Sequence, residues 1–151
     1  SDVCSSDLSG LAPRTAHREL KVLKEAFTLG REALICEEVS NPVGPGNVIF
    51  LEVDCEAITE LFTGFGERGL SGETLARRVV AEAQAWLQHD APVGEYLADQ
   101  LLVPMALAGG GRFRTGPLSS HTTTNIEVVK RFMDLEIRRE EKEGTVEVAV
   151  G

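Results

Sequence analysis

The chain has 151 residues, of which 42% are hydrophobic and 26% are charged, which is typical of a soluble globular protein with one or two small domains. Its 24 acidic and 15 basic side chains leave a formal net charge of −9. This balance argues against broad, non-specific binding of nucleic acid, which needs a basic surface, but it leaves room for a local basic pocket. No apolar run is long enough to span a membrane.

Three cysteines are spread widely through the sequence, at Cys4, Cys36 and Cys55. The odd count and the absence of a CxxC pair favour a reducing compartment and argue against structural zinc. The first residues also lack the basic start and apolar segment of a signal peptide, so we expect a cytoplasmic protein with no membrane partner. Cys36 and Cys55 lie in apolar stretches, where we expect them to be small core residues.

The first ten residues differ from the rest of the chain. They are rich in serine and aspartate, show no periodicity and do not begin with methionine. We therefore expect residues 1–10 to be a non-native or disordered leader, and we leave them out of the fold prediction. The missing methionine also suggests a fragment of a longer protein.

The first half of the remaining chain predicts two helices and three strands. Residues 14–29 have apolar side chains on one helical face, and Gly30 is a suitable stop. Ser71 is a candidate cap for a second helix, whose apolar residues recur at helical spacing. Strands are predicted over residues 32–39, 48–53 and 58–65.

In the second half, residues 90–94 give the clearest boundary signal. Residues 95–108 are apolar on nearly all sides, which predicts a buried helix, and Pro104 predicts a kink or an early end. The three glycines at 109–111 are a helix stop, a hinge or a point of close approach to a ligand. Asn125 is a candidate helix cap. Strands are predicted over residues 112–115, 119–124, 135–138 and 146–150. Helices and strands alternate without a regular period, so the predicted fold class is α+β.

One histidine in a polar run is the strongest candidate for chemistry. His121 lies within Ser-Ser-His-Thr-Thr-Thr-Asn, residues 119–125. An imidazole with a reference pKa of about 6.5 is mostly neutral at cytosolic pH, so one ring nitrogen can attack phosphorus while a neighbouring hydroxyl or amide holds the other. The alternative is a structural, partly buried histidine near the end of a strand.

Polar side chains interrupt the apolar segment 95–108. Asp99 and Gln100 would need partners in a core, because an unmade buried hydrogen bond costs about 1–3 kcal/mol. They therefore either meet such partners or face a cavity that holds a ligand. Tyr96 lies one turn before Gln100 on the same face, where a phenol and an amide can stack on a purine and hydrogen-bond it, or can bridge two helices.

Common catalytic motifs are missing from the sequence. There is no GxSxG, HExxH, EF-hand or Rossmann motif, so serine hydrolases, zinc proteases and dehydrogenases have no support. The Gly-Pro-Gly-Asn segment at 44–47 lacks the spacing of a P-loop and predicts a tight turn.

Four stretches stand in a characteristic order. They are Gly-Pro-Gly-Asn at 44–47, Thr-Glu-Leu-Phe at 59–62 with Gly-Phe-Gly-Glu at 64–67, the segment 94–109, and His-Thr-Thr-Thr-Asn-Ile at 121–126. This order resembles the C-terminal part of the RNA 3'-terminal phosphate cyclases, over about residues 11–150. The resemblance implies an insert domain at residues 11–91. It also implies that residues 92–151 are the last α+β repeat of a cyclase catalytic core.

The resemblance also implies an activity. His121 matches the nucleophilic histidine of the family, which attacks the α-phosphorus of ATP to give a histidine-AMP intermediate. The AMP then passes to an RNA 3'-phosphate, and the neighbouring 2'-hydroxyl closes a 2',3'-cyclic phosphate. Such an enzyme is an ATP-dependent ligase that acts on RNA 3'-phosphate ends, with a divalent cation, expected to be magnesium, offsetting the charge of the triphosphate. The family's ATP-contacting stretch matches Tyr96, Leu97, Ala98, Asp99 and Gln100.

Further features of the chain bear on this implied activity. Family members are considerably longer, so we expect this chain alone to be an inactive fragment. Arg112 and Arg114 are candidates to bind RNA phosphates.

A related branch of non-catalytic ribosome-assembly factors lacks the histidine, so an RNA- or ribosome-assembly module on the same fold is the alternative, and His121 favours the enzyme. A generic acidic domain with a structural histidine is a third possibility. Adenylation needs an imidazole that solvent can reach, near Tyr96–Gln100.

Overall fold

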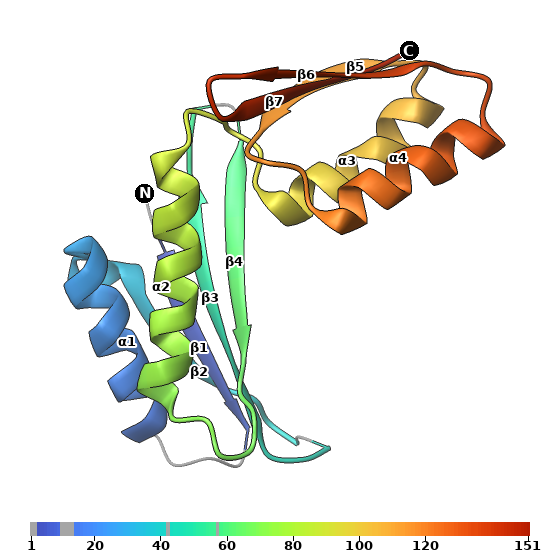
Figure 1. Cartoon of the computed structure of the whole chain (residues 1–151). Helices are drawn as coiled ribbons and strands as arrows, with labels where there is room; N and C mark the ends of the chain where they lie inside the picture. The colour runs from blue at the N-terminus through green and yellow to red at the C-terminus, as the bar shows by residue number, and fades with distance from the viewer. Residues whose placement is uncertain (1–2, 10–13, 42, 57) are drawn as a thin grey trace. The chain divides into compact units, whose positions relative to one another are not determined.

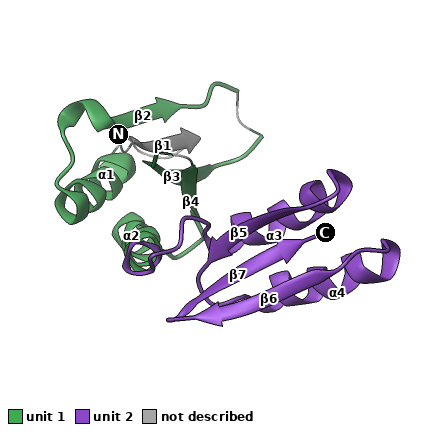
Figure 2. Cartoon of the chain, turned by 90° about the horizontal axis from the view of Figure 1, so that it is seen from above, with its two compact units in different colours: residues 1–85 green, residues 86–151 purple. Residues whose placement is uncertain are grey.

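The computed structural model describes residues 3–9, 14–41, 43–56 and 58–151. The chain divides into two compact units, Ser1–Ala85 (unit 1) and Trp86–Gly151 (unit 2), and each combines helices with a small sheet (Figures 1 and 2). This arrangement confirms the α+β class. None of the helices within the described ranges is long and apolar enough to cross a bilayer.

Unit 1 is built on a four-stranded sheet in the order β2-β1-β3-β4. Strand β1 pairs in parallel with β2 and antiparallel with β3, and β3 pairs antiparallel with β4. The three strands predicted for this half of the chain are present, although residues 31–33 form a short 3-10 turn. The strands are β1 Val3–Ser9, β2 Leu34–Glu38, β3 Gly46–Asp54 and β4 Thr59–Phe65.

Strand β1 corrects one expectation from the sequence. Val3–Ser9 were left out of the fold prediction as part of a non-native or disordered leader, yet they form a central strand of this sheet. Backbone groups make the pairing on both sides, so the strand needs no alternating pattern of its own to be held. Residues 1–2 and 10 lie outside the described ranges.

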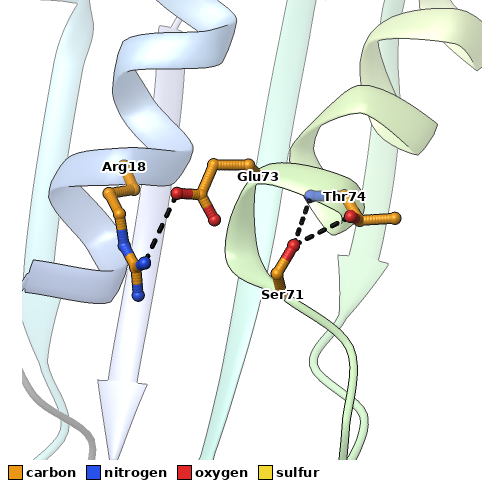
Figure 3. Close-up of polar contacts among 4 residues, drawn as sticks. All are labelled: Arg18, Ser71, Glu73 and Thr74. Carbon is orange, nitrogen blue, oxygen red and sulfur yellow. Dashed lines mark hydrogen bonds and ion pairs between the residues drawn. The ribbon is translucent and has the colours of Figure 1, made fainter.

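Two helices cover one face of this sheet (Figure 1). They are α1 Arg14–Phe27 and α2 Gly72–Gln88. Ser71 caps α2 as predicted, because its Oγ accepts a hydrogen bond from the Thr74 amide at 3.2 Å (Figure 3). The core of the unit contains Ala16, Leu23, Ile49, Leu51, Val53, Phe62, Leu75, Ala76, Val79, Val80 and Ala83.

Polar contacts join α1 to the elements beside it. Arg18 forms an ion pair with Glu73 at 3.4 Å, on the surface (Figure 3). Glu19 is fully buried, and its Oε1 accepts a hydrogen bond from Asn47 Nδ2 at 2.6 Å. The partly exposed ion pair contributes little to stability, whereas the buried carboxylate depends on its partner.

Two cysteines do not lie where the sequence indicated. Cys36 and Cys55 are both exposed, so the expectation that they are core residues is wrong. Cys36 belongs to β2, in which every residue but the first is exposed. Cys55 lies in the turn after β3, where its amide donates to the Ile58 carbonyl at 2.9 Å. Strand β2 is at the edge of the sheet, and a turn lies at the surface, so neither position is covered.

Unit 2 has a three-stranded antiparallel sheet in the order β5-β7-β6. Its strands are β5 Gly111–Thr115, β6 Ile137–Lys142 and β7 Thr145–Val150. The β6–β7 hairpin turns at Glu143 and Gly144, whose φ angles of 51° and 80° give the twist that suits a tight hairpin. Helices α3 Glu95–Leu107 and α4 Ser120–Phe132 pack on one face of the sheet (Figure 2).

Helix α3 is buried along one face only. Ala98, Leu102 and Ala106 are buried at intervals of four residues, while Val103 and Leu107 are 44% and 73% exposed. The expectation of a helix buried on all sides is therefore wrong for this chain. The helix continues three residues past Pro104 and ends in a Schellman motif, in which the Gly109 and Gly110 amides bond to the Ala106 and Met105 carbonyls.

The packing of α2 on β4 depends on the absence of a side chain at Gly64. A Cβ there would lie 2.6 Å from Val79 Cγ2 and 3.1 Å from Leu75 Cδ1, and both side chains are buried. We expect Gly64→Ala to lower the free energy of unfolding by about 1–3 kcal/mol, because the helix must move away from the strand. Urea denaturation measures the change. Gly46→Ala, whose Cβ would meet nothing within 4 Å, is the control, and equal losses in the two variants would contradict the close approach.

Candidate active site

Helix α4 begins earlier than the sequence indicated. Ser119 has extended backbone angles, and its Oγ accepts a hydrogen bond from the Thr122 amide at 3.1 Å. Thr123 Oγ1 in turn donates to the Ser119 carbonyl at 2.9 Å. The predicted strand at 119–124 is therefore wrong, and the cap is Ser119 rather than Asn125. The hydroxyls satisfy groups of the first turn, which outweighs the preference of threonine for strands.

His121 is exposed on the first turn of α4. The next residue, Thr122, is fully buried and faces the core with Ile126 one turn later. Because successive residues of a helix point about 100° apart, burial of Thr122 directs His121 outward. The imidazole is accessible to solvent and lies at the start of a helix, so it is not the partly buried histidine near a strand end of the alternative interpretation.

The segment Tyr96–Gln100 forms the first turns of α3, and its five side chains have different surroundings. Tyr96 is 62% exposed, and Gln100, one turn later on the same face, is also exposed. Ala98 is only 1% exposed and belongs to the core. Leu97 and Asp99 are half-buried. Only Tyr96 and Gln100 therefore present their side chains freely at the surface.

A side-chain amide links the two helices. Asn125 Nδ2 donates to Asp99 Oδ1 at 3.0 Å and to the Asp99 main-chain carbonyl at 3.2 Å. Asp99 thus has a hydrogen-bond partner within the protein, which is the first of the two alternatives that the sequence left open for this residue. The sequence pattern predicted Asn125 only as a helix cap and not as a partner of Asp99. A pattern that indicates such a pair was present, because each of the two helices carries a polar residue beside its buried apolar face.

The link joins the two helices about one turn after each begins. Strands β5 and β6 are both antiparallel to β7. The helices that precede them, α3 and α4, run in the same direction (Figure 1). His121 is one turn before Asn125, and Tyr96 is one turn before Asp99. The candidate residues His121 and Tyr96 therefore each lie near the start of one of two parallel helices, and helix N-termini favour anions.

The candidate RNA-binding arginines lie on the other face of the sheet. Arg112 and Arg114 alternate along β5 with Phe113 and Thr115, which are buried. Arg114 also forms an ion pair with Asp90 at 3.3 Å. The two arginines are therefore not brought to His121. On that outer face, Arg114 and its neighbours border a cavity of about 480 Å³, which is lined by Gln88, His89, Asp90, Arg114, Glu140, Lys142, Glu143, Thr145 and Glu147.

Other electrostatic features lie outside the site. Among the described residues there is no cluster of three or more histidine, cysteine, aspartate or glutamate side chains that could hold a metal ion. At the start of β6, Arg138 hydrogen-bonds Glu136 at 2.7 Å and lowers the pKa of that carboxyl. Both side chains are exposed, so the pair does not build a binding site.

Comparison with known proteins gives a consistent result. A family model described as RNA 3'-terminal phosphate cyclase matches residues 12–138. A protein of that name from Pseudomonas fluorescens is 43% identical over 129 residues, which are 85% of this chain and 38% of the relative. Another from Ectopseudomonas mendocina is 42% identical over 122 residues, which are 81% of this chain and 36% of the relative. The chain thus spans less than two fifths of the length of either relative.

The family match covers most of both units, including α3 and α4 with the linked residues Asp99 and Asn125. We conclude that this chain belongs to the RNA 3'-terminal phosphate cyclase family.

Proposed function

We propose that this chain is part of an ATP-dependent enzyme that converts an RNA 3'-phosphate to a 2',3'-cyclic phosphate through a covalent histidine-AMP. The observation that carries the proposal is the exposed imidazole of His121, on a helix that Asn125, one turn further along, links to Asp99 in the Tyr96–Gln100 segment of α3. The names of the relatives support the same reaction. An imidazole buried in the core could not reach a triphosphate, and this one is not buried.

The proposed reaction begins with the lone pair of one ring nitrogen of His121. It attacks the α-phosphorus of ATP, a phosphorus–nitrogen bond forms, and the bond to the β-phosphate oxygen breaks, so that pyrophosphate leaves. An oxygen of the RNA 3'-phosphate then attacks the same phosphorus, and the bond to nitrogen breaks. The 2'-hydroxyl finally attacks the 3'-phosphorus, loses its proton and expels AMP, which closes the cyclic phosphate.

The first turns of α3 are proposed to hold the nucleotide. The ring of Tyr96 and the amide of Gln100 share an exposed face and suit stacking on, and hydrogen bonding to, a purine. Ala98 lets the helix approach the core, so its contribution is close packing rather than a contact through its own side chain. The two helix N-termini favour the negative triphosphate, whose charge a divalent cation, proposed to be magnesium, would offset further.

The remaining assignments follow from the family. We propose that residues 11–91 are the insert domain and residues 92–151 the last repeat of the catalytic core. Because the match covers 38% of the length of the Pseudomonas fluorescens relative, further contacts to ATP and RNA would come from segments outside this chain, and the chain alone would be inactive. The wide spacing of its cysteines suits a reducing compartment, which we propose is the cytoplasm.

Replacing His121 by alanine is expected to abolish adenylation. Full-length protein that contains this chain is incubated with α-labelled ATP and magnesium, and acid-labile, hydroxylamine-sensitive label on the protein is measured. The labelling rate of His121→Ala should fall at least about a thousand-fold, because the nucleophile is gone. His89→Ala, which removes another exposed histidine of unit 2, should label like the wild type.

Two results would contradict this proposal. Label that persists in His121→Ala would remove His121 as the nucleophile. Wild-type protein that never labels would favour the alternative, a non-catalytic RNA- or ribosome-assembly module on the same fold.

Replacing Tyr96 by alanine is expected to weaken ATP binding. Base stacking on an aromatic ring contributes about 1–3 kcal/mol, so the KM for ATP in the adenylation assay should rise about 5- to 150-fold. Tyr96→Phe keeps the ring and should stay close to the wild type. Leu107→Ala, which removes another exposed side chain of α3 far along the helix, is the matched control. An unchanged KM in Tyr96→Ala would exclude the stacking role.

A further inference from the structure

The link between Asn125 and Asp99 is a directional contact in a mostly apolar interface between helices. The two helices carry buried apolar side chains near it in the sequence, Leu102 on α3 and Ile126 and Val129 on α4. Apolar contacts depend little on direction, so they allow small slides and rotations of one helix on the other. The amide of Asn125 bonds to both the carboxylate and the main-chain carbonyl of Asp99, at 3.0 and 3.2 Å, which restricts both movements.

The position of the link along the helices is informative. Asn125 lies one turn after His121 on α4, and Asp99 lies one turn after Tyr96 and next to Gln100 on α3. Any displacement at the link is therefore transmitted over only one helical turn to both halves of the candidate site. No other side-chain hydrogen bond between α3 and α4 is present within the described part of unit 2.

We infer that Asn125 and Asp99 are positioning residues for adenyl transfer. Their link fixes α4 on α3, so that the imidazole of His121 meets the α-phosphorus of an ATP molecule held by Tyr96 and Gln100. The inference rests on the proposed function, and it gives Asp99 a role different from that of a nucleotide ligand. Attack needs the reacting atoms within about 3–3.5 Å, and a displacement of about 1 Å can lower the rate about a hundred-fold.

This role requires an oxygen acceptor at position 99 rather than a negative charge. Asparagine at 99 keeps an Oδ1 that can accept from Asn125, whereas alanine removes this side-chain acceptor and leaves only the main-chain carbonyl. A residue that contacts the nucleotide or its metal through its charge would lose function in both variants. Asp99→Asn and Asp99→Ala therefore separate the two roles.

The test measures single-turnover adenylation of full-length protein across a range of ATP concentrations. Asn125→Ala and Asp99→Ala should lower the maximal rate about 10- to 100-fold and change the KM for ATP less than about 3-fold, because the nucleotide still binds but the imidazole is misplaced. Asp99→Asn should stay within a few-fold of the wild-type rate. Glu127→Ala, an exposed change on α4, is the matched control and should have no effect.

A reversed pair guards against simple misfolding. Asn125→Asp alone sets two carboxylates against each other and should be at least as slow as Asn125→Ala. Adding Asp99→Asn places an amide at position 99 that can donate to the carboxylate at position 125, which restores the side-chain hydrogen bond in the opposite direction. This double variant should react at least about 10-fold faster than Asn125→Asp alone. Recovery of this kind shows that the single variant lost the link rather than the fold.

Several outcomes would overturn the inference. A wild-type rate in Asn125→Ala would show that the link does not position the histidine. An Asp99→Asn variant as slow as Asp99→Ala, with a raised KM for ATP, would make Asp99 a nucleotide ligand. Wild-type protein that never labels would overturn the proposed function itself, and the positioning role with it. A labelled wild type beside an unaffected Asn125→Ala overturns the positioning role alone.

Discussion

A polar side chain that a helix turns toward the protein interior must find a hydrogen-bond partner, and in both units an asparagine provides it. In unit 1, Asn47 donates to the fully buried carboxylate of Glu19, which joins the start of β3 to α1. In unit 2, Asn125 donates to Asp99 and joins α4 to α3. Leaving such a group without its partner would cost about 1–3 kcal/mol, so each link restricts how its elements can pack. In unit 2 that restriction falls on the two helices that carry the candidate site.

The net charge of the chain does not conflict with the proposed site for ATP and RNA ends. The −9 charge excludes a broad basic surface, but an anion can be held by local groups over a few ångströms. At the starts of α3 and α4, main-chain amides provide such groups, because the first amides of a helix have no partner within the helix. Ser119 satisfies one of those amides in α4, whereas Gly94 at the start of α3 has no side chain with which to do so. The electrostatic field at the starts of α3 and α4 is therefore set by backbone geometry, which cannot be predicted from the net charge.

Sequence reasoning succeeded where a repeating pattern determines an element and failed where a single contact does. The apolar spacing around Leu23 and Val79 predicted α1 and α2, an apolar run predicted β3, and alternation predicted β7. It missed β1, whose place depends on backbone pairing with strands that follow later in the chain. It also made a strand of residues 119–124, because three successive threonines favour a strand until Ser119 caps a helix. The motif identified His121 and Tyr96–Gln100 as candidates, but the partner of Asp99 could be found only once α3 and α4 had been set side by side.

Helix geometry also explains why the five consecutive side chains of Tyr96–Gln100 cannot all contact one ligand. Successive side chains point about 100° apart, so a ligand on one face can touch residues separated by three or four positions and not all of a continuous run. Tyr96 and Gln100 satisfy this spacing and are exposed, Ala98 points into the core, and Asp99 points toward α4. A segment that resembles a nucleotide-binding motif therefore divides into side chains that are free to meet a ligand, one that packs in the core and one that accepts a hydrogen bond from the neighbouring helix. The residue types in such a continuous motif are therefore determined partly by contacts with a ligand and partly by the packing of the helix.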